Sequence, residues 1–272
     1  MSVKTILVAY SGWSSAQRPL KHALKIANHH DAWLTGIVGH GKSHVLRLFA
    51  GQMPSEVFAL LKENERKEIA DAKDTFAKEV ARNNRSHRSD FLDVIDEDGG
   101  TVASFSRTFD LVVTAPHTTA RDEEHMSASP DLIALQSGRP VLIVPKEYDA
   151  PGLSTHVLVA WDGKRAAARA IGDAMPMLEE KGKVTVLTIG AKTPAGTDRL
   201  IQNLRHHGIR TDHLQSSKTG SIGNTILVTA QDIGADLIVM GAYEHSKFAH
   251  DVFGGVTTDV LEGMNVPVLM SH

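Results

Sequence analysis

Cysteine is absent from this chain, aromatic residues are scarce, and no apolar run is long. The 272 residues include no cysteine, and only 5% are aromatic. The missing thiols exclude disulfides, thiolate zinc sites and cysteine nucleophiles. The first apolar run holds about five or six residues, which is too short for a secretory leader or a membrane span. We therefore expect a cytoplasmic protein without a membrane partner.

An excess of charge of either sign is also missing. The formal net charge is −3 at pH 7, with 22% charged and 42% hydrophobic residues. Proteins that hold nucleic acid through its phosphates carry a basic surface, so we expect no nucleic-acid partner. The composition is that of a globular protein, and the length suffices for two domains.

What the chain does contain is an internal repeat. Three strand-like segments occur twice in the same order, at 6–12 and 157–163, at 110–113 and 236–239, and at 140–143 and 267–270. Such self-similarity indicates two copies of one fold. We therefore predict a first domain at 1–147, a linker at 148–154 and a second domain at 155–272.

Short β-branched runs alternate with amphipathic stretches in both copies. The segments 157–161 and 184–189 are typical of buried parallel strands. The segment 14–30 has helical spacing, with Ser14 and Ser15 as candidate N-caps. The alternation predicts an α/β fold, in which a parallel sheet carries helices on both faces.

The first copy is the longer one, and its extra length contains a predicted helix at 55–82. Apolar residues lie on one face of this helix, and charged residues such as Glu63 and Lys67 fill the other. A charged helical face is usually solvated. A helix that binds a partner protein is the alternative interpretation.

Four segments of the second copy together resemble the universal stress protein family in its tandem two-domain form. They are Val-Leu-Val-Ala-Trp-Asp-Gly at 157–163, Gly-Ala-Asp-Leu-Ile-Val-Met-Gly-Ala-Tyr at 234–243, Gly-Gly-Val-Thr-Thr at 254–258 and Val-Pro-Val-Leu-Met at 266–270. Each segment alone is a weak signal, but the four in order are specific. The resemblance covers nearly all of both halves.

The resemblance implies two Rossmann-like domains of the adenine nucleotide alpha hydrolase-like kind. Each would hold a five-stranded parallel sheet in the order 3-2-1-4-5, flanked by helices. Domains of this family pair through their last strands, so we expect Val141–Val144 to pair with Val268–Met270 and cover these strand edges. A homodimer of the whole chain and unidentified protein partners are further expectations.

The members of this family that bind ATP carry Gly, two residues, Gly, nine residues, Gly, then Ser or Thr. Gly241 matches the first glycine and Gly254 the third, whereas Glu244 replaces the second glycine and Gly255 replaces Ser or Thr. A carboxylate about 5 Å from a phosphate opposes it by roughly 3 kcal/mol at an effective dielectric near 20, which is about two decades of affinity. ATP or AMP remains the expected cofactor, with a poor fit for triphosphate and with Mg²⁺ only alongside the nucleotide.

General architecture also predicts a nucleotide site in the second domain, because ligands of doubly wound sheets bind where the winding reverses. There Asp162 offers a carboxylate to ribose or adenine, and Gly241 lets the backbone approach a phosphate. The N-terminus of the helix that begins near Gly255 offers a binding site for an anion. Ala160 and Met240 would line the adenine. The candidate cofactor-binding residues are Ala160, Trp161, Asp162, Met240, Gly241, Glu244, Gly254, Gly255, Val256 and Thr257.

Each of these residues also has a structural alternative. Asp162 can cap the helix that begins near Lys164, and the glycines can serve as strand ends and loops. In the first copy the corresponding positions are Ser11, Ala115 and Pro116. Ser11 supplies no carboxylate and Pro116 has no backbone N–H, so we expect the first domain to lack a nucleotide.

Neither a catalytic residue nor a metal site is predicted. His29-His30 and His206-His207 lie late in helices, where neighbouring side chains diverge by about 100°; this favours stabilisation of the helix ends over metal binding. The chain has no phosphate loop and no nucleophile elbow. We therefore expect a stress-response protein that binds an adenine nucleotide or related anion without efficient turnover. An interaction or scaffold module is the alternative, and a slow nucleotide hydrolase is a weaker one.

Overall fold

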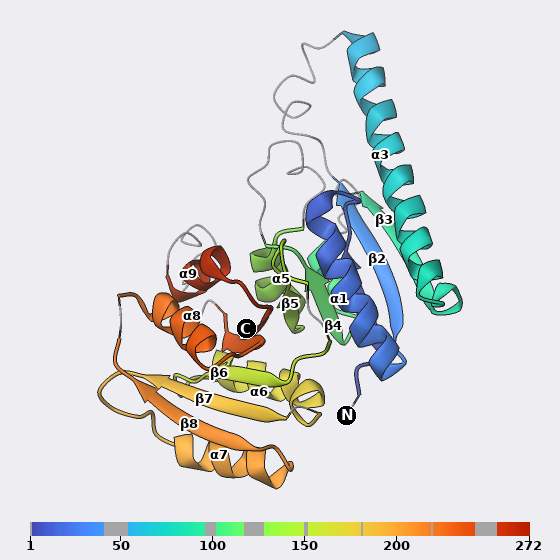
Figure 1. The fold of residues 1–272 in the computed structure, drawn as a ribbon. Coiled ribbons are helices and arrows are strands. Elements are labelled where there is room, and N and C mark those ends of the chain that lie inside the picture. The colour runs from blue at the N-terminus through green and yellow to red at the C-terminus, as the bar shows by residue number, and fades with distance from the viewer. Residues whose placement is uncertain are drawn as a thin grey trace.

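The strands form one continuous ten-stranded sheet (Figure 1). The computed structural model describes residues 2–40, 54–95, 102–116, 128–149, 152–180, 182–218, 220–242 and 255–272. The strand order is β3-β2-β1-β4-β5-β10-β9-β6-β7-β8. Counted within each half of the chain, this order is 3-2-1-4-5 twice, so the α/β class and the helix-flanked sheet are confirmed.

Within the first half, every pair of neighbouring strands is parallel. Its elements are β1 (Thr5–Ala9), α1 (Ser14–His30), β2 (Trp33–His40), α3 (Ser55–Arg82), a 3-10 turn (Ser86–Arg88), β3 (Ser89–Ile95), α4 (Val102–Ser106), β4 (Leu111–Thr114), α5 (Pro130–Ser137) and β5 (Val141–Ile143). The predicted long helix at 55–82 is present with the same bounds. The 17 residues of α1 also match the predicted segment.

The second half repeats the arrangement, with the 10-residue α7 in the place of the 28-residue α3. Its elements are β6 (His156–Ala160), α6 (Arg165–Leu178), β7 (Lys183–Ile189), α7 (Thr197–His206), β8 (Thr211–Ser216), α8 (Ile222–Asp232), β9 (Leu237–Gly241), α9 (Val256–Gly263) and β10 (Val268–Ser271). Among the described residues, no helix is both long and apolar enough to cross a membrane.

The two halves meet at an antiparallel pair of short strands. Val268 lies opposite Ile143, Leu269 opposite Leu142 and Met270 opposite Val141, whereas every other described strand pair is parallel. The resemblance to the family placed the last strands at this seam. Because both edge strands find a partner, neither leaves unpaired backbone groups at the middle of the sheet.

One repeated segment begins with an aspartate in both halves, and this aspartate binds the start of the first strand. The Asp110 carboxylate accepts the backbone N–H groups of Lys4 and Thr5 at 2.8 and 3.0 Å. The Asp236 carboxylate does the same for Thr155 and the following residue, at 2.7 and 3.1 Å. In both halves the fourth strand therefore fixes the start of the first strand through a charge-assisted hydrogen bond.

Helices cover both faces of the sheet, and a hydrophobic core lies on each face. One core includes Leu20 and Leu24 of α1 together with Ala170 and Ala174 of α6, so it is continuous across the two halves. The other lies under α5, α8 and α9 and includes Ile133. The strands between the two cores are buried on both sides, as parallel strands between helical layers must be.

The N-cap predicted for α1 is wrong. The capping position is Trp13, and no side chain caps the helix. Ser15 is buried instead, with 8% of its surface exposed. In α8, by contrast, the Ser221 hydroxyl accepts the Asn224 N–H at 3.0 Å. A serine can cap a helix only where its own backbone is extended, at the N-cap position, and in α1 the residue at that position is Trp13.

Leu269 provides a test of the seam. It is fully buried between the halves, so Leu269→Ala should lower the free energy of unfolding by about 2–5 kcal/mol because it leaves a cavity. Leu132→Ala is the matched control, since Leu132 is 47% exposed and its truncation should cost less than about 0.5 kcal/mol. Urea unfolding measures both; equal losses would contradict a packed seam.

His156 provides a test of acid sensitivity. Burial, followed by the charge of Lys183, lowers the pKa of His156 below its usual value, and its Nε2 lies 2.8 Å from the Thr185 hydroxyl. The unfolded chain, with a histidine pKa of about 6.5, therefore takes up a proton first as the pH falls. The free energy of unfolding should decrease below about pH 6.5 through this histidine.

The variant His156→Gln should remove that part of the acid sensitivity. Denaturant unfolding of both proteins near pH 8 gives the cost of the substitution itself, and unfolding near pH 5 gives the additional effect of acid. We expect the variant to lose less stability than the parent chain between these two conditions. An equally steep loss in both proteins would show that His156 does not contribute.

Candidate functional site

The reversal of winding in the second half lies between β6 and β9. β6 pairs with β7 on one side and with β9 on the other. The chain leaves β6 through α6 toward β7, and it leaves β9 through α9 toward β10. Such a point opens a crevice at the carboxyl ends of the two strands. Asp162, Gly241 and the start of α9 follow these strand ends in the sequence.

Asp162 is exposed in a tight turn between β6 and α6. Its Oδ1 accepts the backbone N–H of Lys164 at 3.0 Å, and the next residue, Gly163, has a φ of +80°. A Cβ on Gly163 would lie 2.8 Å from the Cβ of Pro194. Both this close contact and the positive φ therefore require glycine at position 163. The turn therefore holds one carboxylate oxygen in place and leaves the side chain facing solvent.

This geometry bears on the structural alternative for Asp162. The residue at the N-cap position of α6 is Lys164, whose side chain makes no capping hydrogen bond. Asp162 supports the turn just before the helix and does not occupy the cap position itself. Its carboxylate has two oxygens and about four acceptor positions, so the bond to Lys164 leaves acceptor capacity for a ligand.

Gly241 is explained by helix packing. A Cβ at this position would lie 2.5 Å from the backbone nitrogen of Ala167 and 2.7 Å from the carbonyl carbon of Ala166. The first turn of α6 therefore lies directly against the end of β9, and only glycine admits it. The sequence had attributed this glycine to the approach of a phosphate; the structure gives it a packing role that also places the N-terminus of α6 at the crevice.

The start of α9 forms the other side of this region. Gly255 is its N-cap, with φ +124° and ψ −174° and no side-chain hydrogen bond, a backbone conformation essentially restricted to glycine. This explains why Gly255 stands where the family pattern has Ser or Thr. Val256 is half-buried, and Thr257 is 7% exposed. The helix begins close against α8, because a Cβ on Gly223 would meet the Asp259 Cβ at 2.4 Å.

The residues proposed to line the adenine differ in exposure. Met240 is 4% exposed and packs in the core beneath α8 and α9. Ala160 is half-buried at the end of β6. The indole N–H of Trp161 donates to the Thr197 hydroxyl at 3.1 Å, so its single polar atom already has a partner. Of these three residues, Ala160 is the one that forms the end of strand β6.

Two positions of the predicted site, Glu244 and Gly254, lie outside the described residues. The structure therefore gives no account of the carboxylate that replaces the second glycine of the family pattern. The described part of that pattern is Gly241 and Gly255. Both are glycines for backbone reasons that are visible in the fold.

Ser271 is a polar residue of this region that the sequence interpretation missed. It pairs with Gly241 across the sheet and is 2% exposed, and its hydroxyl has no hydrogen-bond partner among the described residues. A buried hydroxyl without a partner is unusual in a folded protein. The repeat contained the signal, since the corresponding position of the first half is Val144.

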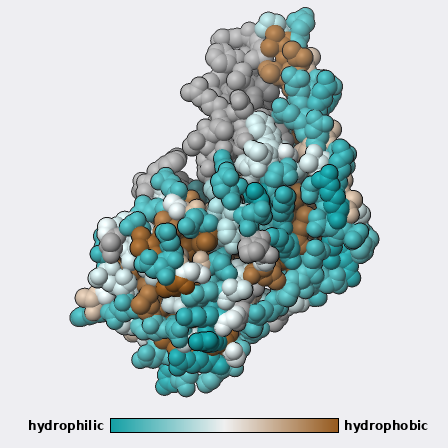
Figure 2. Space-filling view, viewed as in Figure 1, coloured by the Kyte–Doolittle hydropathy of each residue, from teal (hydrophilic) through white to brown (hydrophobic). Residues whose placement is uncertain are grey.

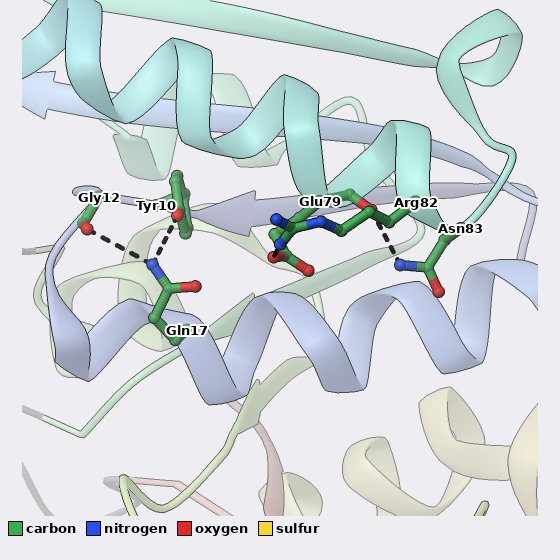
Figure 3. A network of polar contacts seen from close by, with 6 residues as sticks. All are labelled: Tyr10, Gly12, Gln17, Glu79, Arg82 and Asn83. Atoms are coloured by element: carbon green, nitrogen blue, oxygen red, sulfur yellow. Dashed lines mark hydrogen bonds and ion pairs between the residues drawn. The ribbon is translucent and has the colours of Figure 1, made fainter.

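In the corresponding loop of the first half, the Gln17 side chain lies beside Tyr10 and Gly12 (Figure 3). A Cβ on Gly12 would lie 2.8 Å from the Ala72 Cβ, so α3 packs directly over the loop after β1. The Gln17 amide donates to the Tyr10 hydroxyl at 2.8 Å and approaches the Gly12 carbonyl oxygen at 3.5 Å. Burial raises the pKa of Tyr10. The second half has similar packing at this loop, because Pro194 lies beside Gly163 and the Trp161 indole is bound to Thr197.

Comparison with known proteins agrees with the architecture. Residues 202–272 match the model of the universal stress protein family. A universal stress protein from Synechocystis sp. (strain ATCC 27184 / PCC 6803 / Kazusa) is 25% identical over 171 residues, or 59% of this chain. The alignment covers 57% of that protein, so the chain spans little more than half the length of this curated relative.

Solved structures share the fold over the whole chain. The crystal structure of a universal stress protein from Archaeoglobus fulgidus DSM 4304 has a TM-score of 0.76 and 14% identity, with 99% of this chain and 96% of that one covered. A functionally unknown protein from Pseudomonas aeruginosa PAO1 has a TM-score of 0.59 and 14% identity, with 99% and 92% covered. At these identities the likeness establishes the fold.

Gly241→Ala tests the packing role of this glycine. The added Cβ meets backbone atoms of α6 that cannot rotate away, so we expect a loss of about 1–3 kcal/mol in the free energy of unfolding. Gly172→Ala is the matched control within α6, where a Cβ meets nothing within 4 Å and should stabilise the helix by about 0.5–1 kcal/mol. Guanidinium unfolding that shows no loss in Gly241→Ala would refute the close contact.

Proposed function

We propose that the second half of this chain binds an adenine nucleotide or a related anion without efficient turnover. Residues 202–272 match the universal stress protein family, a universal stress protein is 25% identical over 59% of the chain, and the fold is that of a solved universal stress protein. We infer from these findings that the chain belongs to this family. ATP and AMP are the candidate nucleotides, with Mg²⁺ only alongside the nucleotide. The first half serves as structural support for this site.

The observation that carries this proposal is the orientation of Asp162. The hydrogen bond from the Lys164 N–H fixes one oxygen of the carboxylate at the carboxyl end of β6, and the side chain remains exposed. A carboxylate in this position accepts hydrogen bonds from ribose hydroxyls, which is the role of acidic residues in other nucleotide-binding α/β folds. The first half has the buried Ser11 in its place.

The anion would interact with helix N-termini. Gly241 allows the first turn of α6 to lie against the end of β9, and α9 begins at Val256 after the same strand. Helix N-termini carry partial positive charge and outward N–H groups, which favour phosphate. Lys164 and Arg165 at the start of α6 add positive charge to this end of the molecule.

Binding without turnover is consistent with the residues present. The sequence has no phosphate loop and no nucleophile elbow. Asp162 and the helix N-termini would stabilise the charge of the bound nucleotide in the ground state. Slow hydrolysis remains the weaker alternative, and it would depend on the same carboxylate.

Protein interaction is a second candidate function, and α3 is the observation that favours it. The first part of α3 extends beyond β2 and β3 (Figure 1), and hydrophobic atoms gather at its far end (Figure 2). Val57 is 43% exposed and Leu60 is 61% exposed, whereas the buried residues of α3 begin at Ile69. A scaffold or adaptor protein would use this end of α3, in a homodimer or with another partner.

Isothermal titration with ATP and with AMP tests the nucleotide proposal. We expect one equivalent of nucleotide to bind, and Asp162→Ala should weaken binding by about 10–100-fold because a hydrogen bond to a charged group is lost. Asp162→Asn should also weaken it, since its single amide oxygen is needed by the Lys164 N–H. Asp198→Ala is the matched control, because Asp198 lies in the first turn of a different helix.

Two outcomes would overturn or redirect the proposal. Absence of heat at millimolar ATP and AMP, with the chain folded by circular dichroism, would favour the interaction module. The variant Glu244→Gly then distinguishes a site that has lost phosphate binding from a site that the Glu244 charge does not affect. A large gain in ATP affinity would identify a site that has lost phosphate binding, and no change would exclude an effect of the Glu244 charge.

A further inference from the structure

Two histidines of the first half meet a glutamate of the second half on the surface of the sheet. His29 Nε2 lies 2.7 Å from Glu180 Oε2, and His30 Nδ1 lies 3.7 Å from Glu180 Oε1. One ligand atom from each of the three residues lies within 4.8 Å of the other two. His29 and His30 end α1, and Glu180 follows α6. The cluster thus joins the two halves.

These side chains are the donors that a zinc-like ion prefers. Imidazole nitrogens and a carboxylate bind Zn²⁺ at about 2.0–2.2 Å in a tetrahedral arrangement, which places ligand atoms about 3.3–3.6 Å apart. The observed spacings bracket this range. The side chain of His30 is 3% exposed and serves as a fixed anchor, whereas His29 and Glu180 are 44% and 36% exposed and are able to adjust by small rotations.

The electrostatic environment also favours a cation. Two helices, α1 and α6, end at this cluster, and helix C-termini carry partial negative charge. The neighbouring Glu179 is held by His207 at 2.8 Å, so Glu180 is the carboxylate that faces α1. Histidine at a helix C-terminus stabilises it only when protonated; a divalent metal would provide positive charge while the imidazoles stay neutral.

We propose that His29, His30 and Glu180 form a binding site for a divalent transition metal of the zinc class, which ties α1 of the first half to the end of α6 in the second. Three protein ligands leave at least one coordination position for water. The site is distinct from the proposed nucleotide site, because Glu180 and Asp162 lie beyond opposite ends of α6, about 20 Å apart for a helix of this length.

The sequence interpretation rejected a metal here for a reason that the fold removes. The rings of His29 and His30 lie close together, with centroids 5.0 Å apart and ring planes inclined by 86°. A ring nitrogen of each lies within 4 Å of one carboxylate, that of Glu180, which is 150 residues beyond His30 in the chain. A metal ligand this far away in the chain forms no short sequence motif with the two histidines.

Titration of the full chain, without an affinity tag, with Zn²⁺ and separately with Co²⁺ tests the proposal. We expect one equivalent of either ion to bind tightly, with the visible absorption of tetrahedral Co²⁺. His29→Ala and Glu180→Gln should each weaken binding by about 10-fold or more, since the loss even of groups around a metal ligand costs that much. Both residues are exposed enough for the variants to fold.

His206→Ala is the matched control, because His206 also belongs to an adjacent histidine pair at a helix end and lies outside the cluster. It should bind Zn²⁺ as the parent chain does. Absence of tight Zn²⁺ binding by the parent chain would show that the cluster is only an ion-pair contact between the halves. Binding that is unchanged in His29→Ala and Glu180→Gln would place the metal elsewhere. Either result overturns the proposal.

Discussion

The antiparallel pairing of β5 with β10 is the constraint on which the rest of the structure depends. It comprises three residue pairs, yet it converts two five-stranded sheets into one and fixes the direction of each half relative to the other. Sheets accumulate twist from strand to strand, so the strands of the second half run across those of the first (Figure 1). This arrangement brings α1 and α6 over one shared core and lets His29 reach Glu180.

The two halves share a fold and differ in what fills the end of their first strand. In the first half α3 lies over the loop after β1, and Ala72 occupies the space beside Gly12. In the second half Pro194, just before α7, occupies the equivalent space beside Gly163, and the turn presents an exposed Asp162. The described differences here are therefore the length of the helix before the third strand, α3 against α7, and one residue, the buried Ser11 against the exposed Asp162.

The repeated segments and the alternation of strands and helices were enough to predict the class of fold and the bounds of α3, whereas the strand order within each half was implied by the resemblance to the family. The first two features depend on local patterns of burial that a sequence records directly. The roles of single residues depend on neighbours that are distant in the chain. Gly241 is a glycine because of Ala166 and Ala167, and the indole of Trp161 is bound to Thr197. Neither contact is visible from spacing.

Helix α6 is the element that links the two proposed sites, and its packing suggests how they relate. One end lies against β9 through the missing side chain of Gly241, and the other is followed by Glu180, in contact with α1. A helix fixed at both ends presents its N-terminus in one orientation, so an anion would meet a preorganised group and lose less free energy to ordering. Coupling between distant sites requires an element with two arrangements. Because the described contacts hold α6 in one, the two sites should act independently, with metal strengthening the seam and nucleotide occupying the crevice.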